Sequence, residues 1–180
     1  MSIWWSLHLR RDAASVPLAR RLLLGAMETA GVDPEISYDL SVALSEACAN
    51  AVEHGGYADG PRAARTAGRA EHAEDSGHFG DSHDADTFEN ADCEAYCVTA
   101  YLDGETCRIE VTDTGPGFTG AAWRAPVRPA AADAEHGRGL CLIRELADHV
   151  HIGNTPDRGG AVVSFDKVLK WRKDPPLMAV

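Results

Sequence analysis

The stretch from Asp33 to Gly56 constrains the fold most, because it is a long helix with a clear beginning and end. The Asp33 side chain can cap the first turn, and the fixed φ of Pro34 suits the first helical position. Gly55-Gly56 predicts the end of the helix. Apolar residues recur between these signals at helical spacing and predict one buried face: Ile36, Leu40, Ala43, Leu44, Ala47 and Ala51.

Three polar residues form a second stripe on the same helix. Glu46, Asn50 and His54 are four residues apart, so their side chains are predicted to lie in line beside the buried face. Such a stripe can be the solvated edge of a helix. A carboxylate, an amide and an imidazole in line can also be part of a site, and the rest of the chain decides between the two.

Regular elements are predicted on the N-terminal side of this helix. Residues 3–10 alternate loosely and are rich in aromatic side chains, which favours a strand. A further helix is predicted from Ser15, with Pro17 in its first turn and Gly31 beyond its end. Its apolar stripe is predicted to consist of Leu18, Leu22, Ala26 and Ala30.

Residues 57–95 differ from the rest of the chain in composition. They carry three arginines against ten carboxylates and few bulky apolar side chains. A segment of this kind buries too little surface to offset its ordering entropy, so we expect a solvated, largely disordered insertion. Three histidines in it are compatible with a metal-binding tract, but an incidental polar loop is the preferred interpretation.

Regular structure is predicted to resume at Tyr96. Two strands flank Asp103-Gly104, a pair typical of hairpin turns. Residues 119–136 have few structural signals and are predicted to be a loop. A helix over residues 140–150, a short strand over 149–154 and a final strand over 161–169 complete the pattern, and residues 171–180 are predicted to be a tail.

Two glycine motifs lie between the predicted strands and helices. Asp113 ends the second hairpin strand and is followed by Gly115 and Gly117. Glycines at such positions indicate that the backbone passes close to a ligand or to another segment of backbone. Gly137 and Gly139 precede the next helix and leave its first amide groups open, which suits a phosphate. Each motif alone most often marks a turn. Their order after the helical stripe is more specific.

The composition limits the function classes. The formal net charge is −11, so a nucleic-acid partner is not expected, and no apolar run is long enough for a membrane span. The five cysteines are an odd, scattered set, which fits reduced thiols in the cytoplasm. Cys93 and Cys97 with His83 lack the spacing of a structural zinc site. We therefore expect a single domain over residues 1–170.

The three motifs together resemble the GHKL ATP-binding fold, which is shared by histidine kinases, gyrase-type ATPases and a class of chaperones. The chain is most similar to the small anti-sigma factor serine kinases of the RsbW and SpoIIAB type. The resemblance covers about residues 3–56 and 95–170. It implies an α+β fold, a two-layer sandwich with a mostly antiparallel sheet and helices on one face, and the predicted element order agrees with it.

The resemblance also implies roles for residues of the helical stripe and of the first glycine motif. Asn50 resembles the asparagine that ligates Mg²⁺ between the ATP phosphates, and an amide oxygen suits this cation. Glu46 resembles the general base. Asp113 resembles the aspartate that binds the adenine amino group, with room for the base left by Gly115 and Gly117. His54 matches a helix-end position with a structural role.

The second glycine motif carries the implied phosphate contacts. Gly137 and Gly139 resemble the hinge and the phosphate-facing turn, in a G-x-G-L motif completed by Leu140. Arg138 lies between these two glycines. The resemblance implies that it pairs either with a phosphate or with a partner protein, and both alternatives remain open. One position departs from the family pattern: the final motif has Gly159, Gly160 and Ala161 where a threonine is common, so a hydroxyl contact to phosphate is expected to be missing.

Two functions follow as expectations. The resemblance implies an anti-sigma factor that sequesters a sigma factor and phosphorylates a STAS-type antagonist, with ATP and Mg²⁺ as cofactors and a homodimer as a possible assembly. The missing threonine favours an alternative, a nucleotide-gated interaction module without kinase turnover. A sensor histidine kinase is not favoured, because only His8 precedes the helical stripe and no dimerisation helix is predicted.

Overall fold

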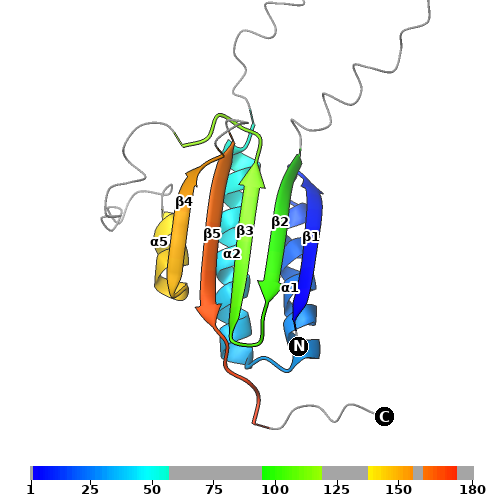
Figure 1. Cartoon of the computed structure of the whole chain (residues 1–180). Helices are drawn as coiled ribbons and strands as arrows, with labels where there is room; N and C mark the ends of the chain where they lie inside the picture. The colour runs from blue at the N-terminus through cyan, green and yellow to red at the C-terminus, as the bar shows by residue number, and fades with distance from the viewer. Residues whose placement is uncertain (1, 57–94, 119–137, 156–159, 174–180) are drawn as a thin grey trace, which may run out of the picture.

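The computed structural model describes residues 2–56, 95–118, 138–155 and 160–173 of the chain (Figure 1). The described elements are, in chain order, β1 (Ile3–Arg10), α1 (Ser15–Ala30), α2 (Pro34–His54), β2 (Ala95–Leu102), β3 (Thr106–Asp113), α5 (Arg138–Leu146), β4 (His149–Asn154) and β5 (Ala161–Val168). Their order is the predicted one. The helix predicted over residues 140–150 begins two residues earlier and ends at Leu146.

One five-stranded sheet joins the strands in the order β1-β2-β3-β5-β4, and every neighbouring pair is antiparallel. The predicted hairpin is present: Val98 faces Val111, and Ala100 faces Ile109. Its turn is fixed by Asp103, whose Oδ1 accepts hydrogen bonds from the backbone of Glu105 and Thr106 at 2.9 and 2.7 Å. The predicted α+β sandwich class is confirmed.

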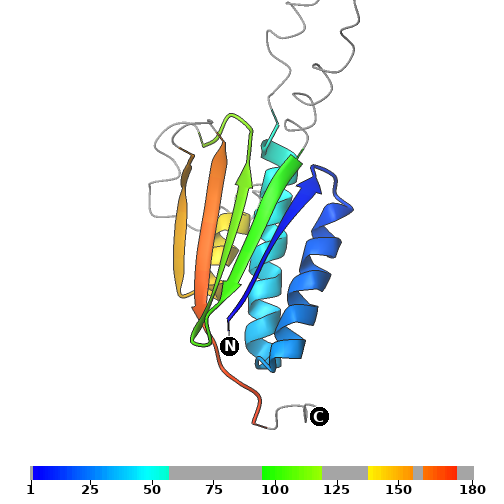
Figure 2. The same ribbon diagram turned by 45° about the vertical axis from the view of Figure 1, so that its right-hand side comes forward.

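The described helices all cover one face of the sheet (Figures 1 and 2). α2 lies between α1 and α5 and contacts both. The whole predicted apolar face of α2 is buried. The other side of this core consists of inward side chains of the sheet, among them Val98, Ile109 and Phe165. The opposite face of the sheet carries no described helix.

The predicted apolar stripe of α1 is wrong by one position. Leu18 and Leu22 are 44% and 43% exposed, whereas Ala19, Leu23 and Met27 are fully buried. A shift of one residue turns a helix by about 100°. The run of apolar residues in this helix supports either phase, so only packing on the sheet decides which side is inward. The correction leaves two leucines on the solvent side of α1.

Both ends of α2 lie where the sequence predicts them. Asp33 caps the first turn and accepts a hydrogen bond from the backbone of Glu35 at 2.9 Å. The helix ends at Gly55, but the φ of Gly55 is −74°, so conformational freedom is not the reason for glycine. A Cβ there would lie 2.8 Å from the Cβ of Asp113. Gly55 is therefore required by close packing of α2 against the end of β3.

A mostly buried ion pair fixes the C-terminal end of α5. Lys167 Nζ on β5 donates to the backbone carbonyl of Leu146 at 2.5 Å and lies 3.2 Å from the carboxylate of Asp39 on α2. The lysine and aspartate side chains are 14% and 25% exposed. A cation at a helix C-terminus is favourable, and here it also joins three elements. This contact holds α5 in place beside α2.

The chain beyond β5 is attached to the turn between α1 and α2. The backbone of Arg172 donates to Gly31, and its side chain donates to the carbonyl of Val32 at 3.2 Å. The predicted tail therefore begins with residues that belong to the domain. The predicted insertion lies outside the described residues except for Ala95, which begins β2. None of the described helices has the length and apolarity to cross a bilayer.

A buried polar chain connects β2 with both long helices. Ser15 Oγ donates to the backbone carbonyl of Asp12 at 2.6 Å and lies 2.7 Å from the hydroxyl of Tyr96. Because the single proton of Ser15 is used, Tyr96 must be the donor to Ser15. Cys48 on α2 hydrogen-bonds Tyr96 from the other side, and burial raises the pKa of its thiol to about 12. Cys48 is therefore an inert thiol.

Replacing Tyr96 by phenylalanine is expected to destabilise the fold by about 1–2 kcal/mol, because Ser15 and Cys48 lose their buried partner. For a chain of this size the midpoint of thermal unfolding falls by roughly 2–8 °C. Tyr101→Phe is the matched control, since Tyr101 lies on the same strand but is 43% exposed. Equal midpoints for the two variants, measured by circular dichroism, would contradict this role of the buried hydroxyl.

Candidate functional site

Glu46 and Asn50 lie one turn apart on α2, beside its buried face. The side-chain nitrogen of Asn50 is buried and has no hydrogen-bond partner among the described residues. An amide group in this state costs about 1–3 kcal/mol, so its presence requires an explanation. His54, the third member of the predicted stripe, is exposed at the helix end and lies 3.8 Å from Glu53. The structure therefore separates His54 from the other two.

The start of α5 packs on this pair. A Cβ on Gly139 would lie 2.8 Å from Glu46 Oε2 and 3.7 Å from Asn50 Nδ2. Glycine at position 139 thus lets the first turn of α5 approach both side chains. Arg138 is exposed, whereas Leu140 packs against the hydrophobic core. Gly137 lies outside the described residues. The structure therefore brings together three predicted site residues from two elements that are far apart in the sequence.

Asp113 is the last residue of β3 and is held by two backbone amides. Its Oδ1 accepts hydrogen bonds from Gly115 at 2.9 Å and from Ala161 at 3.0 Å. Within the described part of the chain, Oδ2 has no hydrogen-bond partner. Because one oxygen fixes the carboxylate, the other has a defined direction in which it can accept a bond. A fixed acceptor of this kind suits the exocyclic amino group of a base.

Packing explains the glycines around Asp113. A Cβ on Gly115 would lie 2.6 Å from the carbonyl carbon of Gly55, and one on Gly160 would lie 1.7 Å from the carbonyl oxygen of Asp113. Gly117 has a φ of +70°, which favours glycine. Contacts between backbones are thus sufficient to explain Gly115. That Gly115 and Gly117 make room for a base remains a prediction.

Two features of this site were not predicted as part of it. The amide side chain of Asn154, at the end of β4, binds both backbone groups of Phe118. Gly160 packs on Asp113, although the sequence analysis linked its segment to phosphate. Ala161 lies beside Asp113, whereas the glycine start of α5 lies beside Glu46 and Asn50. An asparagine before a turn has no sequence signal that distinguishes it from an ordinary turn residue.

Comparison with known protein families identifies a domain in this chain. The model of the histidine kinase-like ATPase domain matches residues 9–167, which is most of the chain. The chain belongs to this family. The histidine kinase-like ATPase domain therefore includes every element that forms the site, from α2 to β5. Membership implies that the chain binds ATP.

A solved structure supports the fold of this histidine kinase-like ATPase domain. The crystal structure of the RsbU and RsbW domains of Rv1364c from Mycobacterium tuberculosis matches with a TM-score of 0.53 and 20% sequence identity. The match covers 92% of this chain and 33% of that chain. The chain thus spans about a third of the length of the protein it matches. No curated protein sequence matches it.

The described residues of this histidine kinase-like ATPase domain fit a nucleotide with Mg²⁺. The buried Asn50 nitrogen is a donor without a partner among the described residues, which suits a phosphate oxygen, and the amide oxygen of the same side chain is a ligand that Mg²⁺ accepts beside waters and phosphate oxygens. Asn50 would hold the cation through its amide oxygen. The start of α5 lies beside Asn50, and the first turn of a helix offers backbone N–H groups that suit a phosphate. Asp113, with its fixed carboxylate, would accept from the base.

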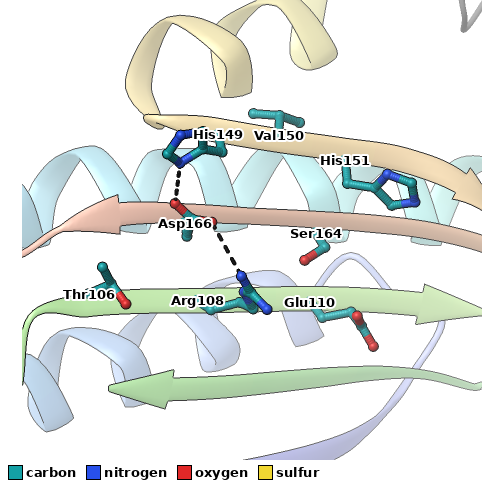
Figure 3. Close-up of a pocket in the computed structure, with 8 residues that line it drawn as sticks. All are labelled: Thr106, Arg108, Glu110, His149, Val150, His151, Ser164 and Asp166. Carbon is teal, nitrogen blue, oxygen red and sulfur yellow. Dashed lines mark hydrogen bonds and ion pairs between the residues drawn. The ribbon is translucent and has the colours of Figure 1, made fainter. Parts of the chain in front are cut away.

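A groove of about 660 Å³ lies elsewhere, on the open face of the sheet (Figure 3). It is lined by Thr106, Arg108, Glu110, His149, Val150, His151, Ser164 and Asp166. Asp166 Oδ1 lies 2.8 Å from His149 Nδ1, and Asp166 Oδ2 lies 3.7 Å from the Arg108 guanidinium. This groove is on the side of the sheet away from α2, so it is separate from the Glu46 and Asn50 pair. Among the described residues, no cluster of side chains suited to a metal is present.

The hydrogen bond that the imidazole donates to Asp166, together with the aspartate charge, raises the pKa of His149 above its ordinary 6.5. This contact therefore contributes stability below the ordinary pKa, and the contribution is lost as the pH rises through the raised pKa. An NMR titration of the imidazole is expected to show the raised pKa in the wild type and a lower one in Asp166→Asn. In Glu110→Gln, which removes a charge that does not contact His149, it stays high. Equal pKa values with and without the Asp166 charge would refute this assignment.

Proposed function

We propose that this chain is an ATP-dependent anti-sigma factor with protein serine/threonine kinase activity. In this proposal it sequesters a sigma factor and phosphorylates a STAS-type antagonist in the bacterial cytoplasm. The observation that carries the kinase part is the position of Glu46. Its carboxylate lies against the glycine start of α5 and one turn from Asn50, where a phosphoryl group would be held. A module that only binds nucleotide would not need this carboxylate.

The proposed reaction is the transfer of the γ-phosphoryl group to a hydroxyl of the antagonist. The serine or threonine oxygen forms a bond to the γ-phosphorus, the bond from that phosphorus to the bridging oxygen breaks, and ADP leaves. Glu46 accepts the proton of the attacking hydroxyl. The amide groups at the start of α5 orient the phosphates, and Asn50 would hold a cation that supplies charge neutralisation there. Positioning and charge neutralisation are the main requirements of phosphoryl transfer.

The solvent side of α1 supports a protein partner. Leu18 and Leu22 are exposed and one turn apart. Adjoining exposed leucines on a helix are compatible with a surface that a partner covers. The sigma factor, the antagonist and a second copy of the chain are the proposed candidates for the partner that covers this surface.

A second candidate function is a nucleotide-gated interaction module without turnover. Ala161 favours it, because its backbone binds Asp113 but its side chain offers no hydroxyl at a position where the family commonly has threonine. The two candidates differ in one property. Both predict binding to a partner that depends on ATP, and only the kinase predicts a phosphorylated antagonist.

A two-part experiment tests the proposal. First, the full chain is used to capture partners from its native cytoplasm with and without ATP and Mg²⁺, and the captured proteins are identified by mass spectrometry. Second, each captured STAS-type protein is incubated with the chain and ATP labelled in the γ-phosphoryl group. A sigma factor in the first part and a labelled serine or threonine in the second support the proposal. ATP-dependent capture without any labelled protein favours the module. Capture of no sigma factor contradicts the proposed function, and capture of no protein in an ATP-dependent way contradicts both candidates.

A further inference from the structure

The side chain of Asn154 makes the contacts that a neighbouring strand would make. Its Oδ1 accepts from the backbone N–H of Phe118 at 2.7 Å, and its Nδ2 donates to the carbonyl of the same residue at 3.1 Å. Only an amide offers one donor and one acceptor in this arrangement. Aspartate has the acceptor without the donor, and alanine has neither. The position is therefore specific for asparagine or a close equivalent.

The same pair of strands holds the other end of the segment from Asp113 to Phe118. Ala161 on β5 is the register partner of Asn154 on β4, and its N–H donates to Asp113 Oδ1 at 3.0 Å. Thr155 closes this end of the strand pair through its hydroxyl, which accepts from the backbone of Gly160 at 2.9 Å. One strand end thus fixes both the first and the last residue of the turn.

The turn between these two points depends on its ends. Gly115 packs on Gly55 and donates to Asp113, and Gly117 adopts a φ of +70°. The side chain of Phe118 packs against the core, so holding its backbone fixes the last residue of the turn. Both hydrogen bonds to Asn154 are exposed, so water can replace them and their loss costs the fold little. Their effect is on the direction of the Asp113 turn.

We propose that Asn154 is a positioning residue that sets the base selectivity of the nucleotide site. It does so by holding Phe118, which keeps the turn in the form that directs Asp113 Oδ2 towards an adenine amino group. This inference rests on nucleotide binding as part of the proposed function. GTP lacks an amino group at the corresponding ring position, so its binding does not use this acceptor. Loss of Asn154 therefore weakens ATP binding and leaves GTP binding unchanged.

The test measures dissociation constants of ATP and GTP, each with Mg²⁺, for the full chain by calorimetry. For Asn154→Ala, the affinity for ATP is expected to fall by about tenfold, as for the loss of the one hydrogen bond that Asp113 Oδ2 accepts from the base. The affinity for GTP is expected to stay at its wild-type value. Asn154→Asp, which keeps the acceptor and loses the donor, is expected to lower ATP affinity as well. It also serves as the second variant if the alanine variant fails to fold.

His151→Ala is the matched control, because His151 is on the same strand, exposed on the open face of the sheet. It is expected to change neither affinity. An unchanged ratio of the two affinities in both Asn154 variants overturns the inference, whether both affinities stay or fall together, since a general loosening of the site lowers both equally. A wild-type chain that binds no nucleotide refutes the proposed function instead, so the two failures are distinguishable.

Discussion

Replacing Asn50 by alanine is expected to weaken Mg²⁺-dependent ATP binding strongly without unfolding the protein. The cation has Asn50 as its proposed protein ligand, and we expect a loss of affinity of roughly 100-fold, which corresponds to about 2.8 kcal/mol. The free energy of unfolding is not expected to decrease. The Asn50 nitrogen is buried without a partner among the described residues, and removing such a group relieves a cost of about 1–3 kcal/mol.

Calorimetry with ATP, with and without Mg²⁺, and thermal unfolding without ligand measure both effects. His54→Ala is the control, because His54 lies one turn further on the same helix but is exposed. It is expected to bind ATP like the wild type. If the Asn50→Ala variant bound ATP with wild-type affinity, Asn50 would not be a residue of the nucleotide site. A large fall in its unfolding midpoint would mean that the buried amide is structural.

Replacing Glu46 by glutamine is expected to stop phosphoryl transfer and to preserve ATP binding. Glutamine has the shape of glutamate but cannot accept the proton of the attacking hydroxyl. General base catalysis contributes about 100- to 10,000-fold, so the rate of labelling of the antagonist should fall by that factor. The affinity for ATP should change little, because the proton is transferred only during the reaction.

The rate is measured in single-turnover reactions with saturating ATP, which separates chemistry from binding. Glu53→Gln is the matched control, since Glu53 is an exposed carboxylate on the same helix. A Glu46→Gln variant that transfers phosphate at the wild-type rate would rule out Glu46 as the base. If ATP affinity falls as much as the rate, Glu46 acts in binding.

The sequence predicts the elements of this fold well, because the signals are local. Asp33 and Pro34 mark the start of α2, and Asp103-Gly104 marks the hairpin. The phase of α1 was not predictable, since apolar residues occupy two neighbouring stripes and only the sheet selects Leu23 over Leu22. Periodicity gives the existence of an amphipathic helix more reliably than its orientation.

In the candidate site, too, the local features are predictable from the sequence and the contacts between distant segments are not. The stripe of Glu46 and Asn50 is predictable because helical spacing alone places it. The contact of Gly139 with this stripe joins α2 to α5, and the spacing of either motif does not encode it. Asn154 was missed for the same reason, because its partner Phe118 is 36 residues away. Side chains that hold another segment's backbone become visible only in the folded structure.

The most direct test of the account is a crystal structure of the full chain with a non-hydrolysable ATP analogue and Mg²⁺. The account predicts the adenine amino group within hydrogen-bond distance of Asp113 Oδ2, Mg²⁺ bound by the amide oxygen of Asn50, and the phosphates at the start of α5. A nucleotide bound in the groove on the open face of the sheet, or a cation without Asn50 as ligand, would contradict it.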